Sequence, residues 1–393
     1  MAMTSPDVYP CTPVLLVDHR LPAIGCGLWL DRVLDVSRLE RYLSALQPHH
    51  LDIVLDVAVA ESHTRLEVVM AQCAVCDVAP WLYVICDNEQ FEDDLARLAR
   101  WCDDSDFSPA GMLVTPRAYL KSYQPDGDWP DGASPARVLA FARQLWPETP
   151  LGGGFPIYFT ELNRCRPDPE RIDFITHALS PIVHAADDGS VMETLESLPH
   201  LFKSARALAP EVPYRVTTTA IGAWTNPYGE RLTANEGMAR VTLSDNDPRQ
   251  RGLFGAAWST GVVARAAQGA VDALTLSSLG PPFDVAGDTP YPIFHVLRGL
   301  IRGGGRPLLV WPQAPDHVAA IGWQAPDGAR DELWLANLSI EPVTLALHGV
   351  RVRGAALLDA HTPLEDVQWM DRLQPVSSPI TLPAFGTVRL LLE

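Results

Sequence analysis

The sequence predicts an α/β protein in which a (β/α)8 TIM barrel is followed by an antiparallel β-sandwich. Two observations support this fold class. Short apolar runs alternate with amphipathic helical patterns over residues 20–302. From residue 307 onward, closely spaced segments follow in which apolar and polar residues alternate. A chain of 393 residues is long enough for one large domain and one smaller domain.

Eight apolar runs are the expected strands of the barrel. They are residues 23–30, 51–57, 80–86, 110–114, 151–159, 174–177 with 181–184, 214–219 and 271–276. Such continuous apolar runs are typical of parallel strands that helices cover. Amphipathic helices are expected over 36–46, 91–101 and 136–146. An open doubly wound sheet would also fit the alternation, but no GxGxxG loop follows the first run, and eight strands favour a closed barrel.

The pattern changes after Arg302-Gly-Gly-Gly-Arg-Pro307, which we interpret as an inter-domain linker. Beyond it, six segments of β character are expected at residues 318–323, 332–337, 343–347, 355–358, 380–382 and 387–392. The expected domains are therefore a barrel over 1–302, with a short N-terminal lead-in, and a β-sandwich over 307–393.

Charge and composition limit the possible partners. The 48 acidic residues outnumber the 30 basic residues and give a net charge of −18, which disfavours binding to nucleic acid or to anionic membranes. Neither a signal peptide nor a long apolar span is apparent, and the seven scattered cysteines suggest reduced thiols. We therefore expect a cytoplasmic protein with no membrane partner, no metal and no cofactor.

The densest group of polar residues follows the fifth apolar run. It contains Tyr158, Glu161, Asn163 and Arg164, at the carboxyl end of a strand, where barrel active sites form. In an extended segment, Glu161 and Asn163 would point to the same face. A carboxylate beside an amide suits hydrolysis, since one transfers a proton while the other binds a developing oxyanion or a sugar hydroxyl. The alternative is a Glu and an Asn that merely begin a surface loop.

Three further sets of residues are candidates. His184 and Asp187 follow the sixth run, although His184 could be a core histidine, and Asp187 could cap the next helix together with Asp188 and Ser190. Arg249 lies on a loop before a helix and could bind a carboxylate or lactone oxygen, or could form a structural clasp with Asp247. Asn226 and His295 are weaker candidates. We expect Glu161, Asn163, His184, Asp187 and Arg249 to converge on one pocket.

Four segments together resemble the barrel domain of D-apionate lactonases. They are residues 151–167, 183–194, 247–250 and 254–258, and their order and spacing are also similar. The resemblance implies a sugar-acid lactone hydrolase with a glycosidase-like barrel and flanking β domains. Two features differ from the family pattern. Only about 20 residues precede the barrel here, where the family has an N-terminal β domain, and Ser277 and Ser278 stand where the family implies a Glu.

Three hypotheses for function follow. The first is a lactone hydrolase in which water, or a weakly held metal ion, supplies the nucleophile for a small carbohydrate or sugar-acid lactone. Its expected catalytic residues are Glu161, His184 and Asp187, and its expected substrate-binding residues are Tyr158, Asn163, Arg164, Asn226 and Arg249. The second is a glycoside hydrolase with Glu161 as acid/base and Asp187 or Asp284 as the second carboxylate that this reaction needs. The third is a non-catalytic sugar-binding descendant of the barrel, which the serines of the eighth strand favour.

Overall fold

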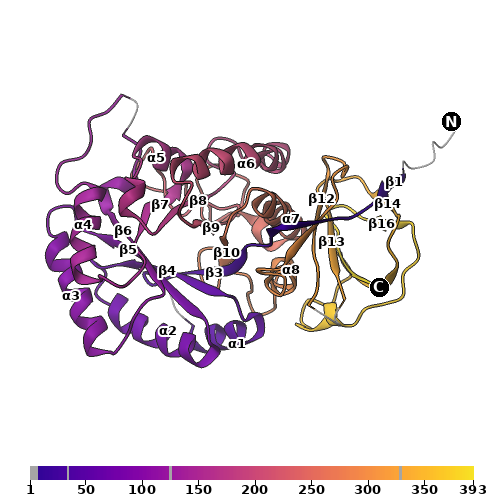
Figure 1. Cartoon of the computed structure of the whole chain (residues 1–393), viewed down its shortest axis with the longest axis horizontal. Coiled ribbons are helices and arrows are strands. Elements are labelled where there is room, and N and C mark those ends of the chain that lie inside the picture. The colour runs from indigo at the N-terminus through magenta and orange to yellow at the C-terminus, as the bar shows by residue number, and fades with distance from the viewer. Residues whose placement is uncertain (1–7, 33–34, 124–125, 327–329) are drawn as a thin grey trace.

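The predicted α/β fold is confirmed in a computed structural model that describes residues 8–32, 35–123, 126–326 and 330–393 (Figure 1). The barrel strands are β3 (Ala23–Trp29), β4 (His50–Asp56), β5 (Ala79–Cys86), β6 (Gly111–Pro116), β7 (Gly152–Tyr158), β8 (Phe174–Leu179), β9 (Tyr214–Thr219) and β10 (Ala273–Ser278). All of their pairings are parallel, in the order β6-β5-β4-β3-β10-β9-β8-β7. A single bridge between Met112 and Leu151 joins the two ends, so the barrel is nearly closed.

Helices surround the barrel. They are α1 (Val36–Leu46), α2 (Ser62–Cys76), α3 (Phe91–Asp104), α4 (Pro135–Leu145), α5 (Phe159–Arg164), α6 (Asp188–Leu208), α7 (Leu253–Gln268) and α8 (Pro292–Ile301). Local sequence explains where several of them begin. The Asp35 carboxylate accepts a hydrogen bond from the Arg38 amide at the start of α1, and Ser134 caps α4 ahead of Pro135.

The helix after β7 is much shorter than the others. α5 has six residues, whereas the other α-helices have 10 to 21, and only a short 3-10 turn at Pro169–Arg171 separates it from β8. The backbone beneath it is tightly packed. Gly154 has φ +109°, and a Cβ there would lie 2.1 Å from the Thr176 carbonyl oxygen, so this position requires glycine. One stretch of the outer barrel wall is therefore left without a long covering helix.

A charged network fills the amino-terminal half of the barrel interior. The Asp52 carboxylate is fully buried, and it accepts hydrogen bonds from Arg215 at 3.2 Å and from the hydroxyls of Thr217 and Thr275. The Arg215 guanidinium also lies over the Trp81 ring, 3.5 Å from its centroid. Each charge in this part of the interior therefore has a partner.

Aromatic side chains close the carboxyl-terminal half of the interior. The Trp29 ring contacts those of Trp224 and Phe283 edge-on, at centroid distances of 6.0 and 5.5 Å. These rings belong to one apolar cluster with Tyr83 and Leu113. The centre of the barrel mouth is therefore filled by side chains, and a site at this end must lie toward its rim.

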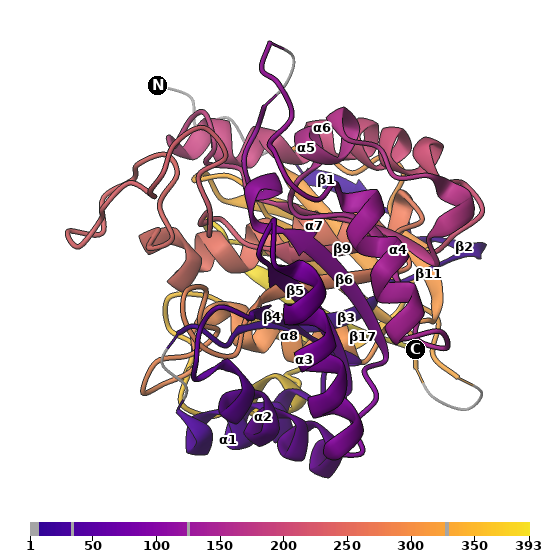
Figure 2. The same cartoon turned by 90° about the vertical axis from the view of Figure 1, so that its left-hand side faces the viewer.

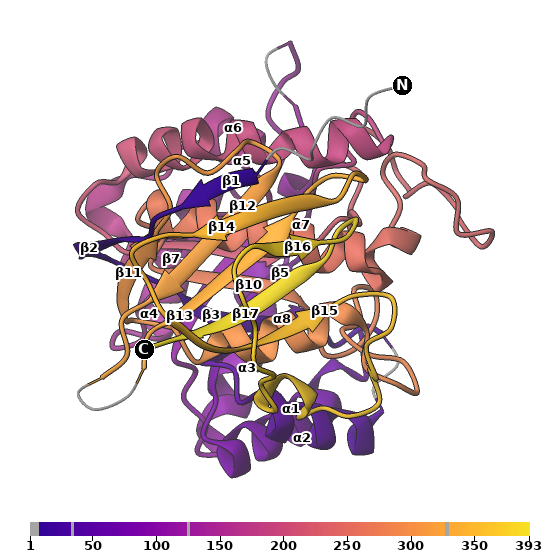
Figure 3. The same cartoon turned by 90° about the vertical axis from the view of Figure 1, so that its right-hand side faces the viewer.

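The second domain consists of two packed β-sheets (Figure 3). The six-stranded sheet has the order β15-β17-β13-β12-β11-β2 and the three-stranded sheet the order β1-β14-β16. Their strands are β1 (Val8–Cys11), β2 (Val14–Arg20), β11 (Pro307–Val310), β12 (Val318–Trp323), β13 (Glu332–Asn337), β14 (Val343–Leu347), β15 (Val352–Leu358), β16 (Ile380–Leu382) and β17 (Thr387–Leu392). All six segments expected after residue 310 are present. The pairings are antiparallel except for β1 with β14.

The N-terminal lead-in differs from the expectation. It was assigned to the barrel domain, but β1 and β2 complete the two sheets of the second domain, because their partners β14 and β11 follow the barrel in sequence. The outer face of the six-stranded sheet packs against α7 and α8. Trp334 lies so close to Gly299 that a Cβ there would be 2.1 Å from the indole ring. No helix among the described residues is long and apolar enough to cross a membrane.

Candidate active site

A buried glutamate lies directly after β7. Glu161 is in the first turn of α5 and is only 5% exposed. Neither of its carboxylate oxygens has a hydrogen-bond partner in the part of the chain that the structure describes. Burial raises the pKa of Glu161, and the neighbouring Ser122 hydroxyl and Arg164 guanidinium offset this shift only in part. A buried carboxyl group with a raised pKa holds its proton more tightly than an exposed one, and such groups are common at functional sites.

Two tyrosines lie close to this carboxylate. The Tyr158 hydroxyl is buried and donates a hydrogen bond to the Thr225 carbonyl oxygen at 3.0 Å. Burial raises the pKa values of both Tyr158 and Tyr228, and the charge of Glu161 raises both further. The hydrogen bond from Tyr158, the last residue of β7, to Thr225 brings the end of β7 and the segment after β9 together at one side of the barrel mouth.

Two loops cover Glu161. The Ser122 amide, in the loop after β6, donates to the Pro227 carbonyl oxygen after β9 at 2.8 Å. Arg164 donates to the Ser122 hydroxyl at 2.5 Å, and the Trp224 indole donates to the Pro156 carbonyl oxygen at 3.0 Å. These bonds join segments that are distant in sequence over the end of β7 and shield the carboxylate from solvent.

A cavity of about 10 Å³, room for about one water molecule, remains beside the carboxylate. Its walls are Tyr119, Lys121, Ser122, Tyr123, Trp129, Phe155, Glu161, Arg164 and Cys165. The Tyr119 ring lies nearly parallel to those of Trp129 and Phe155, at interplanar angles of 17° and 2°. Glu161 and Arg164 thus face a cavity with aromatic walls.

The expected pairing of Glu161 with Asn163 is wrong in its geometry. Residues 159–164 form a helix instead of continuing the strand, so side chains two positions apart point in different directions. Asn163 is exposed, and its side-chain oxygen accepts a hydrogen bond from Arg166 at 2.8 Å.

The segment after β8 also differs from the expectation. Residues 181–184 form a turn instead of a second part of the strand, and His184 is exposed rather than part of the core. Its ring lies 5.7 Å from that of Tyr228, which connects it to the Glu161 group. Asp187 caps α6 by accepting the Ser190 amide, and hydrogen bonds from Ser190 lower its pKa. A helix cap was expected in this segment, and Asp187 is the residue that caps α6.

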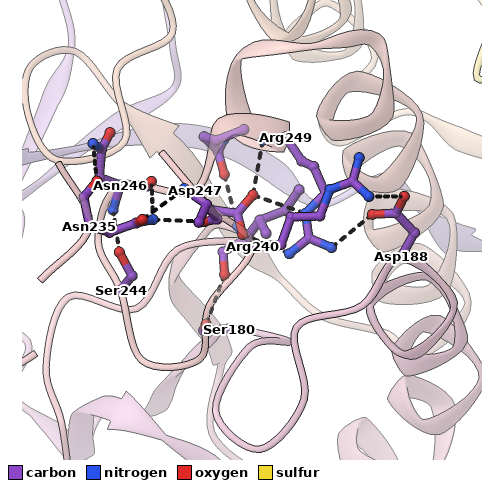
Figure 4. Close-up of polar contacts among 11 residues, drawn as sticks. Ser180, Asp188, Asn235, Arg240, Ser244, Asn246, Asp247 and Arg249 are labelled. Carbon is purple, nitrogen blue, oxygen red and sulfur yellow. Dashed lines mark hydrogen bonds and ion pairs between the residues drawn. The ribbon is translucent and has the colours of Figure 1, made fainter. Parts of the chain in front are cut away.

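Arg249 lies in a second cluster (Figure 4). It is 5% exposed and donates to both carboxylate oxygens of Asp247, at 3.0 and 2.6 Å, and to Asp188 at 3.1 Å. Arg240 reaches the same Asp188 carboxylate at 2.9 Å. The clasp interpretation therefore describes Arg249 better than substrate binding does. These contacts fix the long loop after β9 to the start of α6.

The amide of Asn226 is used within its own turn. Its oxygen accepts from the amides of Tyr228 and Gly229, and its nitrogen donates to the Arg231 carbonyl oxygen. The residues that were expected to form one pocket are thus arranged in two groups. Tyr158, Glu161 and Arg164 lie together, with His184 connected through Tyr228, whereas Arg249 lies among aspartates.

The end of the eighth barrel strand carries hydroxyls instead of a carboxylate. Ser277 has φ +53°, and its hydroxyl accepts a hydrogen bond from the Gln250 side chain at 2.7 Å. The Ser278 hydroxyl donates to the Gly280 carbonyl oxygen. Burial raises the pKa of Asp284, another possible second carboxylate, and the charges of Arg251 and Arg38 oppose this shift. Among the described residues, Arg164 is the only charged side chain found to shift the pKa of Glu161.

Sequence reasoning missed Ser122, Tyr228, Tyr119 and Trp129. Ser122, Tyr119 and Trp129 come from the segment after β6, and Tyr228 follows β9 in an Asn-Pro-Tyr-Gly turn. All four follow a barrel strand, which is the position where site residues are expected. Their loops are long, however, so the sequence did not indicate which of their side chains point inward. The described residues contain no group of three or more His, Cys, Asp or Glu side chains that could hold a metal ion.

The fold and the site together define a two-domain barrel protein with a candidate acid–base residue at the carboxyl ends of its strands. Family models identify it further. The D-apionate lactonase TIM barrel domain matches residues 24–305, and the D-apionate lactonase C-terminal immunoglobulin-like domain matches residues 315–390. The chain therefore belongs to the D-apionate lactonase family.

Individual relatives agree with this assignment. A D-apionate lactonase from Brucella anthropi is 34% identical over 278 residues, which is 67% of this chain and 43% of the relative. The match thus spans less than half of that protein. Among solved structures, a glycoside hydrolase family 30 xylanase from Clostridium acetobutylicum has a TM-score of 0.62 at 8% identity, with 97% of this chain and 99% of the xylanase covered. A family 51 α-L-arabinofuranosidase from Bifidobacterium longum also has a TM-score of 0.62, at 12% identity, with 99% of this chain and 100% of that enzyme covered. These two structures show a shared fold.

Proposed function

We propose that this protein is a hydrolase that opens the five-membered lactone of a small sugar acid, with Glu161 as the residue that transfers protons. The observation that carries the proposal is the buried Glu161 carboxylate, whose two oxygens have no hydrogen-bond partner among the described residues. A buried polar group without partners costs stability, which is typical of a functional site. Family membership favours a lactone as the substrate.

The reaction needs one proton acceptor that later becomes a donor. Glu161 takes a proton from water as the water oxygen bonds to the lactone carbonyl carbon, and the carbonyl π electrons move to its oxygen. The tetrahedral intermediate then re-forms the carbonyl while the bond to the ring oxygen breaks. Glu161 returns the proton to that oxygen, so the product is the open hydroxy acid. A pKa raised by burial suits both steps.

Arg164 and the tyrosines have supporting roles in this proposal. The Arg164 guanidinium, next to Glu161, stabilises the oxyanion that develops on the carbonyl oxygen. Tyr228 and His184 contact substrate hydroxyls at the open side of the site, where both are exposed. Asn163, Asn226, Asp187 and Arg249 have side chains engaged within the protein, and the proposal gives them structural roles.

The two alternatives are less well supported. A glycoside hydrolase needs two carboxylates that flank the scissile bond, and among the described residues Glu161 is the one carboxylate that lines the cavity. A non-catalytic sugar-binding protein would not need an unpartnered carboxyl group with a raised pKa.

The test measures the hydrolysis of a panel of aldonolactones by recording the release of acid at constant pH. We expect turnover by the unmodified protein and a rate about 10²–10⁴-fold lower for Glu161→Gln, because the amide keeps the shape but cannot transfer the proton. Glu196→Gln, at an exposed position on α6, is the matched control and should retain the rate. An unchanged rate in Glu161→Gln would remove Glu161 from the mechanism. No turnover of any aldonolactone would overturn the proposal and favour the sugar-binding alternative.

A further inference from the structure

The arginine that follows Glu161 by three positions does not bind it. Glu161 and Arg164 are both in the six-residue helix α5, where side chains three positions apart are neighbours on the helix surface. Both also line the cavity of about 10 Å³. Neither carboxylate oxygen of Glu161, however, has a hydrogen-bond partner among the described residues. The Arg164 guanidinium is therefore close to the carboxylate but is not bonded to it.

The same spacing gives an ion pair elsewhere in the chain. At three other places that the structure describes, an acidic residue precedes an arginine by three positions. All three pairs are formed: Asp35 with Arg38 at 3.7 Å, Asp94 with Arg97 at 2.6 Å, and Asp168 with Arg171 at 3.3 Å. A glutamate side chain is longer than that of an aspartate, so reach does not explain the missing pair in α5. Another group must hold the Arg164 guanidinium.

Ser122 is the group that Arg164 contacts. The Arg164 guanidinium donates to the Ser122 hydroxyl at 2.5 Å, and this bond joins α5 to the segment after β6 that lies beside it (Figure 2). Ser122 is itself fixed, since its backbone amide donates to the Pro227 carbonyl oxygen at 2.8 Å. The hydroxyl accepts from Arg164 through one lone pair, which leaves its proton available for Glu161 or for a ligand.

Arg164 is the cation best placed to compete for this carboxylate. The other cationic side chain on the cavity wall, Lys121, is exposed. Burial raises the pKa values of the neighbouring groups Tyr119, Tyr158, Tyr228 and Cys165, so they are neutral near pH 7. The remaining titratable groups nearby, among the described residues, are Tyr123 on the cavity wall and His184 beside Tyr228.

We propose that Ser122 is a positioning residue whose hydroxyl holds the Arg164 guanidinium away from Glu161. The carboxylate thereby stays unpaired and able to take and return a proton, while the guanidinium stays free to bind the developing oxyanion. The catalytic use of both groups rests on the proposed lactone hydrolysis. The separation of the two charges does not, so it is tested without substrate.

The experiment titrates Glu161 by NMR in protein labelled with ¹³C at the glutamate carboxyls, and its signal is identified by its absence in Glu161→Gln. Ser122→Ala keeps the backbone bond to Pro227 but removes the acceptor of Arg164, which should then pair with Glu161. A neighbouring guanidinium lowers the pKa of a carboxyl group by about 1–3, so the midpoint should move to lower pH. If Arg164 did not move, loss of the hydroxyl would raise the midpoint, because the Ser122 hydroxyl lowers the pKa of Glu161.

Four further variants sharpen the result. Ser122→Thr keeps a hydroxyl and should keep the midpoint. The double variant Ser122→Ala with Arg164→Met has no guanidinium to pair, so its midpoint should not fall below that of the unmodified protein. Ser204→Ala, at an exposed position on α6, is the matched control. Ser122→Gly removes the same hydroxyl and repeats the test if Ser122→Ala does not fold.

A midpoint that is unchanged or higher in Ser122→Ala would overturn the proposal, and so would an equal fall in the double variant. With a lactone that the unmodified protein hydrolyses, kcat of Ser122→Ala should fall by about 10²-fold with little change in KM, because the guanidinium is withdrawn from the oxyanion. An unchanged kcat at a lowered midpoint would refute the positioning role. A lowered midpoint in a protein that turns over no lactone would refute the proposed function while supporting the separation of the two charges by Ser122.

Discussion

Two buried carboxylates in the same barrel have opposite environments. Asp52, inside the amino-terminal half, is bonded to Arg215, Thr217 and Thr275. Glu161, after the carboxyl end of β7, is nearly as buried but has no hydrogen-bond partner among the described residues. Burial raises the pKa of both groups. The Arg215 charge and the hydroxyls of Thr275, Thr217 and Tyr83 oppose the shift at Asp52, and the nearby Ser122 hydroxyl, the Glu161 backbone and the Arg164 charge oppose it at Glu161.

We interpret the difference as a separation of stability from chemistry along the barrel axis, with Asp52 as a structural group and Glu161 as the proposed reactive group. The Asp52 carboxylate, near the amino ends of the strands, is bonded to three groups, and in barrels of this class no substrate has to bind at that end. A reactive group must keep a free position for substrate, so it remains costly in the unliganded protein. The predictions below test whether Asp52 and Glu161 differ in this way.

The largest expected effect is on stability, at Asp52. Asp52→Asn leaves the buried Arg215 charge without its counter-charge, which should lower the free energy of unfolding by about 3–5 kcal/mol. Urea denaturation measures this loss. Glu92→Gln breaks the exposed pair with Arg137 and should cost less than about 1 kcal/mol. Equal losses in the two variants would contradict a structural role specific to Asp52.

A smaller loss is expected from the clasp around Arg249. Arg249→Ala removes three hydrogen bonds and leaves Asp247 buried without its cation, at a cost of about 3 kcal/mol. Amide exchange in the loop after β9 should accelerate, and lactone hydrolysis should fall with it, because that loop carries Tyr228. Full loss of activity with unchanged exchange would instead place Arg249 on the substrate.

The smallest effect is a pH-dependent gain of stability in Glu161→Gln. The folded-state pKa of Glu161 lies above its usual value of 4.5, so the folded protein binds this proton more tightly than the unfolded chain does. The resulting stabilisation is fully present below pH 4.5 and is lost as the pH rises through the folded-state pKa. The variant does not titrate there. Its stability relative to the unmodified protein should therefore increase from pH 4 to pH 8, by an amount on the order of 1 kcal/mol. The opposite trend in urea titrations would indicate that a partner stabilises the Glu161 charge.

Much of the fold could be predicted because most barrel strands contain a short run of apolar residues. The helix at 36–46 and the β-domain strands at 318–323 and 332–337 occur exactly over the expected residues. The role of residues 8–20 could not be predicted, because those strands pair with β14 and β11, which lie about 300 residues away. Apolar composition at 181–184 suggested a strand, but these residues form a turn anchored by the buried Ile182.

The candidate site was predicted less completely. Position at or after the end of a strand selected Tyr158, Glu161 and Arg164, and their role in a site stays a prediction. The expected pairing with Asn163 assumed extended backbone, and the helix that begins at Phe159 turns that side chain outward. Tyr228 could not be found from local pattern, because a hydrogen bond between two loops brings its turn over Glu161.

The central claim is that Glu161 is left unpartnered for chemistry. It is tested most directly by measuring, on one preparation of Glu161→Gln, both the rate of lactone hydrolysis and the free energy of unfolding at pH 7. The account predicts a rate about 10²–10⁴-fold lower together with stability equal to or above that of the unmodified protein. Lost stability with a retained rate would contradict it, because Glu161 would then be a structural residue like Asp52.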